Sequence, residues 1–193
     1  MKKVVMTVLV GLGFAGLQGY HVVGSPKKAD FTNLILTGKY QKLNPEDIRK
    51  LFDQYNSIVN KIKELEYEGG VTCSANCKKQ YTEVHVHHCI WYPENNNCCC
   101  RYKGSDDVNS NFAPRHYEVA GWVDGLSTID WKDYNDAKNA KNTVLDKLKT
   151  NNLTVSDLIT ICKSGCDYVC KGVGDPGHNI YNPNNSTCAC RIN

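Results

Sequence analysis

The chain has 193 residues, and its 23 lysines and arginines nearly balance its 20 aspartates and glutamates, for a formal net charge of +3. A charge this small provides no overall field to hold nucleic acid or an anionic membrane, so any recognition by charge needs a local patch. The length allows one domain or two small ones.

The first 24 residues have the pattern of a secretory signal peptide. Lys2 and Lys3 precede the apolar run 4–17, which is too short for a transmembrane helix of about 20 apolar residues. Gly19 and Gly24 are both suited to precede the cleavage site. Loss of this leader leaves 21 basic residues against 20 acidic ones, a formal charge of +1. No later segment is long and apolar enough to span a bilayer, so we expect a secreted protein without a transmembrane segment.

A long amphipathic helix is predicted before the first cysteine. The segment 44–47 (Asn-Pro-Glu-Asp) combines a capping side chain, a proline suited to the first turn and two acids that favour the positive end of the helix dipole. Apolar residues then recur at helical spacing from Ile48 to Leu65. The pair Gly69-Gly70 is expected to end the helix.

All 11 cysteines lie downstream of the leader, in two clusters with nearly the same spacing. The first is Cys73-x3-Cys77-x20-Cys98-x-Cys100, and the second is Cys162-x3-Cys166-x21-Cys188-x-Cys190. Flanking residues also repeat at a constant offset of 90. The residues of the first copy are His88, Ile90, Trp91, Pro93, Asn95 and Arg101, and their counterparts in the second copy are His178, Ile180, Tyr181, Pro183, Asn185 and Arg191. This similarity indicates an internal duplication. In an exported chain, cysteines at this density predict a disulfide framework.

Each cluster is predicted to join a helix to a hairpin. In the first copy the strands 84–92 and 98–102 flank the turn 93–97, and in the second the strands 178–181 and 188–192 flank the turn 182–186. The second copy has an amphipathic helix over 130–149 and a capped helix that begins near Thr154 and stops at Gly172.

The predicted fold is a small disulfide-rich α+β protein with two tandem helix-plus-hairpin cysteine modules, each preceded by an amphipathic helix. The expected boundaries are 1–24 for the signal peptide, 25–103 for the first helix and module, 104–129 for a linker and 130–193 for the second helix and module.

The spacing pairs the cysteines of each helix with those of its hairpin. Cys-x3-Cys spans about 6 Å on one face of a helix, and Cys-x-Cys spans about 6–7 Å on one face of a strand. A hairpin register with residue 90 opposite residue 100 also favours a Cys89–Cys99 bond, which leaves Cys170 as a free thiol or as the link in a disulfide-bonded dimer. The expected partners, with the individual pairs left open, are Cys73 and Cys77 with Cys98 and Cys100, and Cys162 and Cys166 with Cys188 and Cys190.

Little in the sequence indicates catalysis. His85, His87 and His88 could offer a metal two ligands on one strand face, but no further ligand pattern follows, so we interpret them as structural or surface residues. The sequence contains no nucleophile elbow and no phosphate-binding loop. We therefore expect no enzymatic activity, no cofactor and no metal.

Two kinds of surface feature remain. Asn152, Asn184 and Asn185 begin N-glycosylation sequons, and Asn152, between two predicted helices, is the favoured site. Cations and an aromatic residue at the ends of the modules are candidates for binding a target, namely Lys78, Lys79, Arg101, Tyr102, Lys103 and Arg191.

The cysteine pattern resembles that of the centipede venom proteins called scoloptoxins, family eleven. The resemblance rests on Cys-Lys-Ser-Gly-Cys at 162–166, Thr-Cys-Ala-Cys-Arg at 187–191 and the parallel set in the first module. It implies a secreted venom toxin, with voltage-gated potassium channels as the target of some members, and it supplies no catalytic residues. The alternative is a secreted binding or structural protein that is not a toxin, such as an inhibitor, a defence factor or a matrix component.

Overall fold

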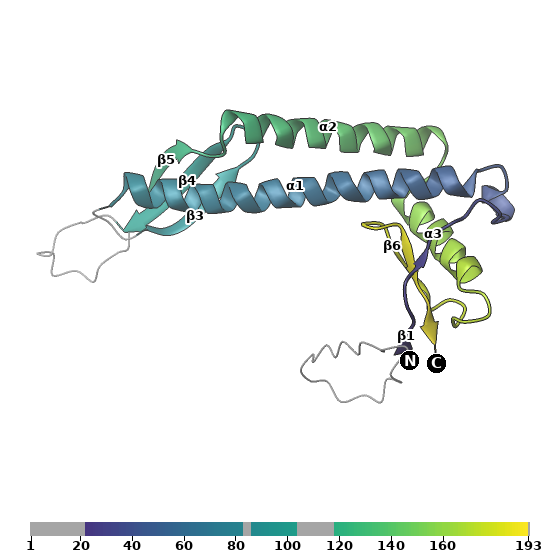
Figure 1. Ribbon diagram of the computed structural model, residues 1–193. Coiled ribbons are helices and arrows are strands. Elements are labelled where there is room, and N and C mark those ends of the chain that lie inside the picture. Colours follow the sequence, from purple (N-terminus) through teal and green to yellow (C-terminus); the bar gives the residue numbers. More distant parts are fainter. Residues whose placement is uncertain (1–21, 83–85, 104–117, 193) are drawn as a thin grey trace, which may run out of the picture.

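The computed structural model describes residues 22–82, 86–103 and 118–192 of the chain. In chain order the elements are β1 (Val22–Val23), β2 (Lys27–Lys28), a short 3-10 helix η1 (Gly38–Tyr40), α1 (Pro45–Gln80), β3 (Val86–Tyr92), β4 (Asn97–Lys103), β5 (Glu118–Asp124), α2 (Thr128–Thr150), α3 (Val155–Val169), β6 (Ile180–Asn182), β7 (Thr187–Ala189) and β8 (Arg191–Ile192). Helices and small antiparallel sheets build two cysteine modules, which confirms the predicted α+β class. The helices α1 and α2 lie side by side, with one module at each end of α1 (Figure 1).

Helix α1 runs unbroken for 36 residues, through the glycine pair that was expected to end it. The indole of Trp91 lies directly against Gly69, where an added Cβ atom would come within 2.4 Å of the ring. Two disulfides beyond the glycines hold the last turns of α1 against the first sheet. Gly69 is therefore a requirement of packing and not a helix end.

Polar side chains fix the starts of the three long helices. Asn44 Oδ1 accepts hydrogen bonds from the amides of Glu46 and Asp47, as predicted. Thr154 and Asp157 form a capping box at the start of α3. Ser127 caps α2, so the helix predicted from residue 130 begins at Thr128. Each cap provides partners for amides that the first helical turn leaves without one.

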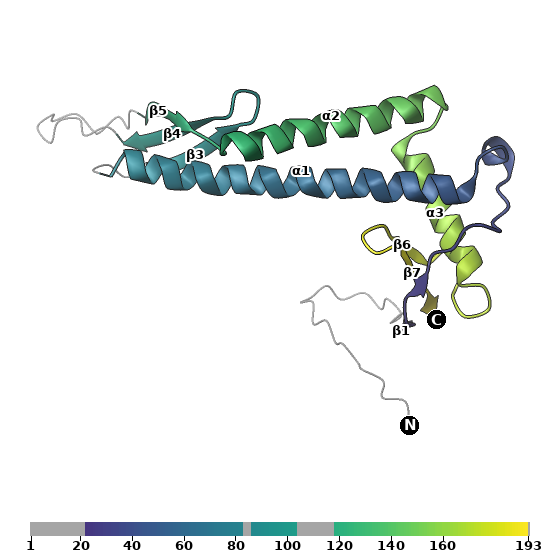
Figure 2. The ribbon, with the colours of Figure 1, turned by 45° about the horizontal axis from the view of Figure 1, so that its top comes forward.

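The helices share two apolar clusters. Midway along α1, Ile62 and Leu65 pack against Tyr134 of α2. A second cluster joins the N-terminal end of α1 to α2 and α3, and its buried members are Ile48, Leu148, Leu153, Leu158 and Ile161. This cluster holds the second module at the N-terminal end of α1, from which it projects away from α2 (Figures 1 and 2).

The two hairpins have the same register, so the duplication extends from sequence to structure. Trp91 lies opposite Cys98 in the β3–β4 hairpin, and Tyr181 lies opposite Cys188 in the β6–β7 hairpin. Asn96 and Ser186, at equivalent positions of the two turns, both adopt a positive φ, 56° and 51°. Non-glycine residues seldom adopt this conformation, so its recurrence supports a common origin of the hairpins.

A third antiparallel strand from the other half of the chain completes each hairpin. β5, within the segment assigned to a linker, comes just before α2 and pairs with β4, with Val123 opposite Cys98. β2, which precedes α1, pairs with β7 and places Lys27 opposite Cys188. β1 also pairs with β8 of the second module. Each half of the chain thus gives at least one strand to the module of the other half, and the modules are structurally dependent on each other.

Candidate binding surface

Four disulfides join helices to hairpins in the described part of the chain. They link Cys73 to Cys98 and Cys77 to Cys100 in the first module, and Cys166 to Cys188 and Cys170 to Cys190 in the second. Within each module the earlier helix cysteine bonds to the earlier strand cysteine. The predicted bonding of each helix to a Cys-x-Cys strand is confirmed. Such bonds are typical of proteins from an oxidising compartment.

The second module uses its last two helix cysteines and not its first two. The predictions that Cys162 is bonded and that Cys170 is unpaired are therefore wrong, and so is a dimer linked through Cys170. Cys162 takes the position of Gly69 in the first module, one helical turn before the first bonded cysteine. It is fully buried in the cluster that contains Phe31, and burial raises the pKa of its thiol to about 12.

The predicted Cys89–Cys99 bond is also wrong, because the hairpin register differs from the expected one by one residue. Ile90 lies opposite Cys99, and Cys89 lies opposite Cys100. Successive strand residues point to opposite faces of a sheet, so the two free thiols lie on opposite faces. Cys89 packs on the disulfide side, toward α1, whereas Cys99 belongs to the opposite side.

The side of the first sheet that faces away from α1 carries three exposed side chains, those of Ile90, Arg101 and Trp122, together with the half-buried Tyr92 and the buried Cys99. We call it the outer face and define it by Ile90, Tyr92, Cys99, Arg101 and Trp122. Ile90, Cys99 and Trp122 lie next to one another across the three strands. Ile90 is 41% exposed and Trp122 57%, whereas the thiol-bearing Cys99 between them is only 4% exposed. The rings of Tyr92 and Trp122 are in contact, with their centroids 5.5 Å apart.

The residues predicted to bind a target do not form one surface. Arg101 is exposed on the outer face, whereas Lys78 and Lys79 are exposed on the last turn of α1, on the other side of the sheet. The side chains of Tyr102 and Lys103 lie outside the described part of the structure. Arg191 is half-buried in the second module, with its amide bonded to Asn179 Oδ1.

Trp122 is not among the predicted site residues, because it falls in 104–129, the segment expected to be a linker. The stretch 118–124 (Glu-Val-Ala-Gly-Trp-Val-Asp) does contain the β-favouring residues that could have indicated a strand. Its pairing with β4 is a long-range contact, which local sequence does not specify.

The second module lacks an equivalent of the outer face. Ile180 takes the position of Ile90 and is 44% exposed, but it lies opposite Ala189, and β2 at the far edge is only two residues long. The duplication therefore gives the second module an exposed residue equivalent to Ile90 but no equivalent of the ring contact between Tyr92 and Trp122.

The histidine cluster lies partly outside the described structure. His85 is not described, and neither is the side chain of His87, whereas His88 is exposed. Among the described residues, no group of three or more His, Cys, Asp or Glu side chains is arranged to hold a metal. Within the same ranges no helix has the length and apolar character needed to cross a membrane.

The three sequon asparagines are all exposed. Asn152 lies just after α2 with a φ of 54°, and Asn184 and Asn185 lie at the tip of the β6–β7 hairpin. Within the described residues, Asn184 is the one of the three whose side chain is hydrogen-bonded to another element, α1.

Comparison of the chain with protein-family models, with curated proteins and with solved structures finds no match.

Proposed function

We propose that the protein is a secreted, non-enzymatic binding protein that attaches to an extracellular target through the outer face of its first module. The observation that carries this proposal is the exposed pair Ile90 and Trp122 on a sheet that two disulfides fix from behind. Tryptophan and tyrosine are enriched among the residues that dominate binding energy at interfaces, and a contiguous exposed apolar group is a typical mark of an interaction site.

Rigidity favours this face over the loops. Its central strand, β4, is hydrogen-bonded on both sides and carries both strand cysteines of the module. Side chains that are held in place before binding lose less conformational entropy when the complex forms. The same aromatic group on a mobile segment would bind more weakly.

We propose a membrane ion channel as the first target class, with voltage-gated potassium channels first among them. Arg101 lies on the outer face, two residues along β4 from Cys99. A cation on the same face of the sheet as an aromatic pair suits the acidic rim or mouth of a cation channel. The resemblance of the cysteine pattern to the scoloptoxins supports the same choice.

Patch-clamp recording across potassium, sodium and calcium channels tests this proposal. The folded protein should block at least one channel at micromolar concentration, and Arg101→Glu should weaken block at least tenfold, which corresponds to about 1.4 kcal/mol. Lys163→Glu, which reverses an exposed charge on α3 of the second module, is the control and should have little effect. No block of any channel would exclude the channel proposal and leave the secreted non-toxin binding protein as the alternative.

A further inference from the structure

We propose that Asn184 carries an N-linked glycan and that a polar groove between the β6–β7 hairpin and α1 holds its first sugar residues. The inference rests on the proposed secretion, because N-glycans are added to exported chains at Asn-x-Ser/Thr sequences.

The groove lies where the tip of the hairpin meets the middle of α1. Its volume is about 340 Å³, at the lower end of the roughly 300–1,000 Å³ typical of small-ligand pockets. Six of the seven residues that line it have polar side chains, and the lining consists of Asn56, Ser57, Asn60, Lys61, Glu64, Pro183 and Asn184. Amide, hydroxyl and charged groups of this kind suit the hydroxyl and acetamido groups of a sugar.

The side chain of Asn184 is oriented by α1. Its Oδ1 accepts hydrogen bonds from Asn56 Nδ2 at 2.7 Å and from Asn60 Nδ2 at 2.9 Å. Within the described structure, Asn184 Nδ2 takes no part in a hydrogen bond. Nδ2 is the atom to which an N-glycan is attached, and Oδ1 can still accept hydrogen bonds after attachment. The two α1 amides would thus hold the linkage in place at the edge of the groove.

The other two sequons lack this arrangement. Asn185 Oδ1 accepts from Thr187 Oγ1 within the same turn, and Asn185 is not part of the groove lining. Asn152 is exposed at the end of α2, where a glycan would extend into solvent.

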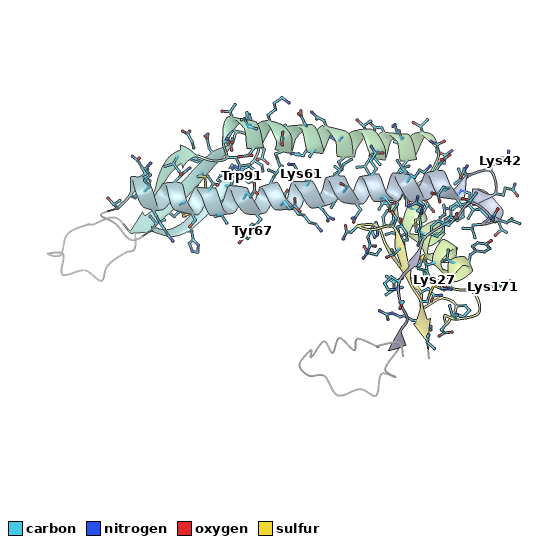
Figure 3. The ribbon with its side chains drawn as sticks, in the orientation of Figure 1. Lys27, Lys42, Lys61, Tyr67, Trp91 and Lys171 are labelled. Carbon is cyan, nitrogen blue, oxygen red and sulfur yellow. A yellow bond between two sulfur atoms is a disulfide. The ribbon has the colours of Figure 1, made fainter. Side chains whose placement is uncertain are left out.

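An exposed aromatic ring continues the groove along α1. Asn60, Glu64 and Tyr67 follow at helical spacing on one side of the helix, and Tyr67 is 75% exposed. Figure 3 shows Tyr67 on the side of α1 from which the second module projects. At a rise of 1.5 Å per residue, Tyr67 lies about 10 Å along the axis from Asn60. An aromatic ring at that distance can pack against a sugar that extends from Asn184.

The modification is tested by secreting the full chain from a eukaryotic cell line and releasing N-glycans in oxygen-18 water, which labels each glycosylated asparagine for peptide mass spectrometry. The label should appear at Asn184, should persist in Thr187→Val, which removes only the Asn185 sequon, and should be lost in Asn184→Gln. Secreted protein without label at Asn184 would overturn the inference and leave the proposed secretion intact. Glycosylated protein that never reaches the medium would support the inference and contradict secretion, and unglycosylated protein retained in the cytosol would contradict both.

The position of the glycan is tested by hydroxyl-radical labelling of tyrosines before and after enzymatic removal of glycans. Removal should increase labelling of Tyr67 severalfold, because the sugars cover its ring. Tyr168, which is 43% exposed on α3 and outside the groove, is the control and should not change. Equal labelling of Tyr67 in both forms would overturn the placement of the sugars in the groove.

Discussion

The amide of Gly125 donates a hydrogen bond of 2.8 Å to the carbonyl of Asn96, and this bond attaches the segment before α2 to the first hairpin. In the second module the amide of Ala29 donates an equivalent bond of 2.9 Å to the carbonyl of Ser186. Each half of the chain therefore binds the hairpin of the other half in the same register. The arrangement is that of a strand-exchanged dimer contained in one polypeptide.

Cutting the folded chain between residues 103 and 118 should leave its halves associated. The disulfides of the described residues lie within 73–100 or within 166–190, so the halves are held together by the exchanged strands and by the packing of α1 against α2 and α3. The measurement is gel filtration after cleavage at a protease site introduced into 104–117. One peak of intact size is expected, which denaturant should resolve into two fragments. Two separate peaks under native conditions would contradict the exchange.

Gly69 and Gly70 should respond to alanine in opposite directions. At Gly69 a Cβ atom would meet the ring of Trp91, so Gly69→Ala should destabilise the protein by about 1–3 kcal/mol. At Gly70 nothing lies within 4 Å of such an atom, so Gly70→Ala should stabilise the helix by about 0.5–1 kcal/mol. Denaturant unfolding measures both changes.

A second substitution checks the cause of the Gly69 effect. In the second module the residue equivalent to Gly69 is Cys162, and the residue equivalent to Trp91 is the smaller Tyr181. Trp91→Tyr should therefore recover part of the stability that Gly69→Ala loses. Additive losses in the double variant would show that contact with Trp91 is not the reason.

The sequence predicts some of these features and not others, for physical reasons. The hairpins are predictable because turn residues and Cys-x-Cys spacing are local. The bonding of Cys170 to the hairpin in place of Cys162 depends on how α3 packs against neighbouring elements. In that packing the ring of Phe31 lies directly against Gly165. The passage of α1 through Gly69 likewise depends on Trp91, and the strand that carries Trp122 depends on pairing with β4. These three features come from contacts between distant segments.

The three free cysteines should react in a definite order. Cys89 is partly exposed, whereas Cys99 and Cys162 are buried, and the raised pKa of Cys162 leaves almost no thiolate at pH 8. Alkylation of native protein should modify Cys89 first, and unfolding without reductant should release three thiols in total. Peptide mass spectrometry identifies the sites. Four or more thiols, or Cys162 reacting before Cys89, would contradict the disulfide assignment.

Acid should weaken the contact between η1 and α3. Hydrogen bonds from Lys39 Nζ at 2.7 Å and Tyr40 Oη at 2.6 Å, together with those from Thr154, lower the pKa of Asp157. The pKa of Asp157 in the folded protein is lower than the value of about 3.9 expected for an aspartate in the unfolded chain. The ionised carboxylate therefore stabilises the folded state fully at pH values above about 3.9, and this contribution to stability is lost progressively as the pH falls below that value. Asp157→Asn should therefore reduce the melting temperature at pH 7 and reduce it less at pH 2.

The control for this prediction is Asp146→Asn, at an exposed position on α2. Its melting temperature should follow that of the unmodified protein across the same pH range. A loss in Asp157→Asn that stays constant from pH 7 to pH 2 would show that the charge of Asp157 is not what stabilises the contact.

A pair of matched substitutions tests whether the outer face of the first module is the binding surface. Ile90 and Ile180 occupy equivalent hairpin positions and are 41% and 44% exposed, but only Ile90 belongs to a face with Trp122. The measurement is the concentration for half-maximal block of the channel that the recordings identify. Ile90→Ala should raise this concentration at least tenfold, with correctly bonded disulfides, and Ile180→Ala should leave it unchanged. Equal effects of the two substitutions, or a loss confined to Ile180→Ala, would contradict binding through the outer face.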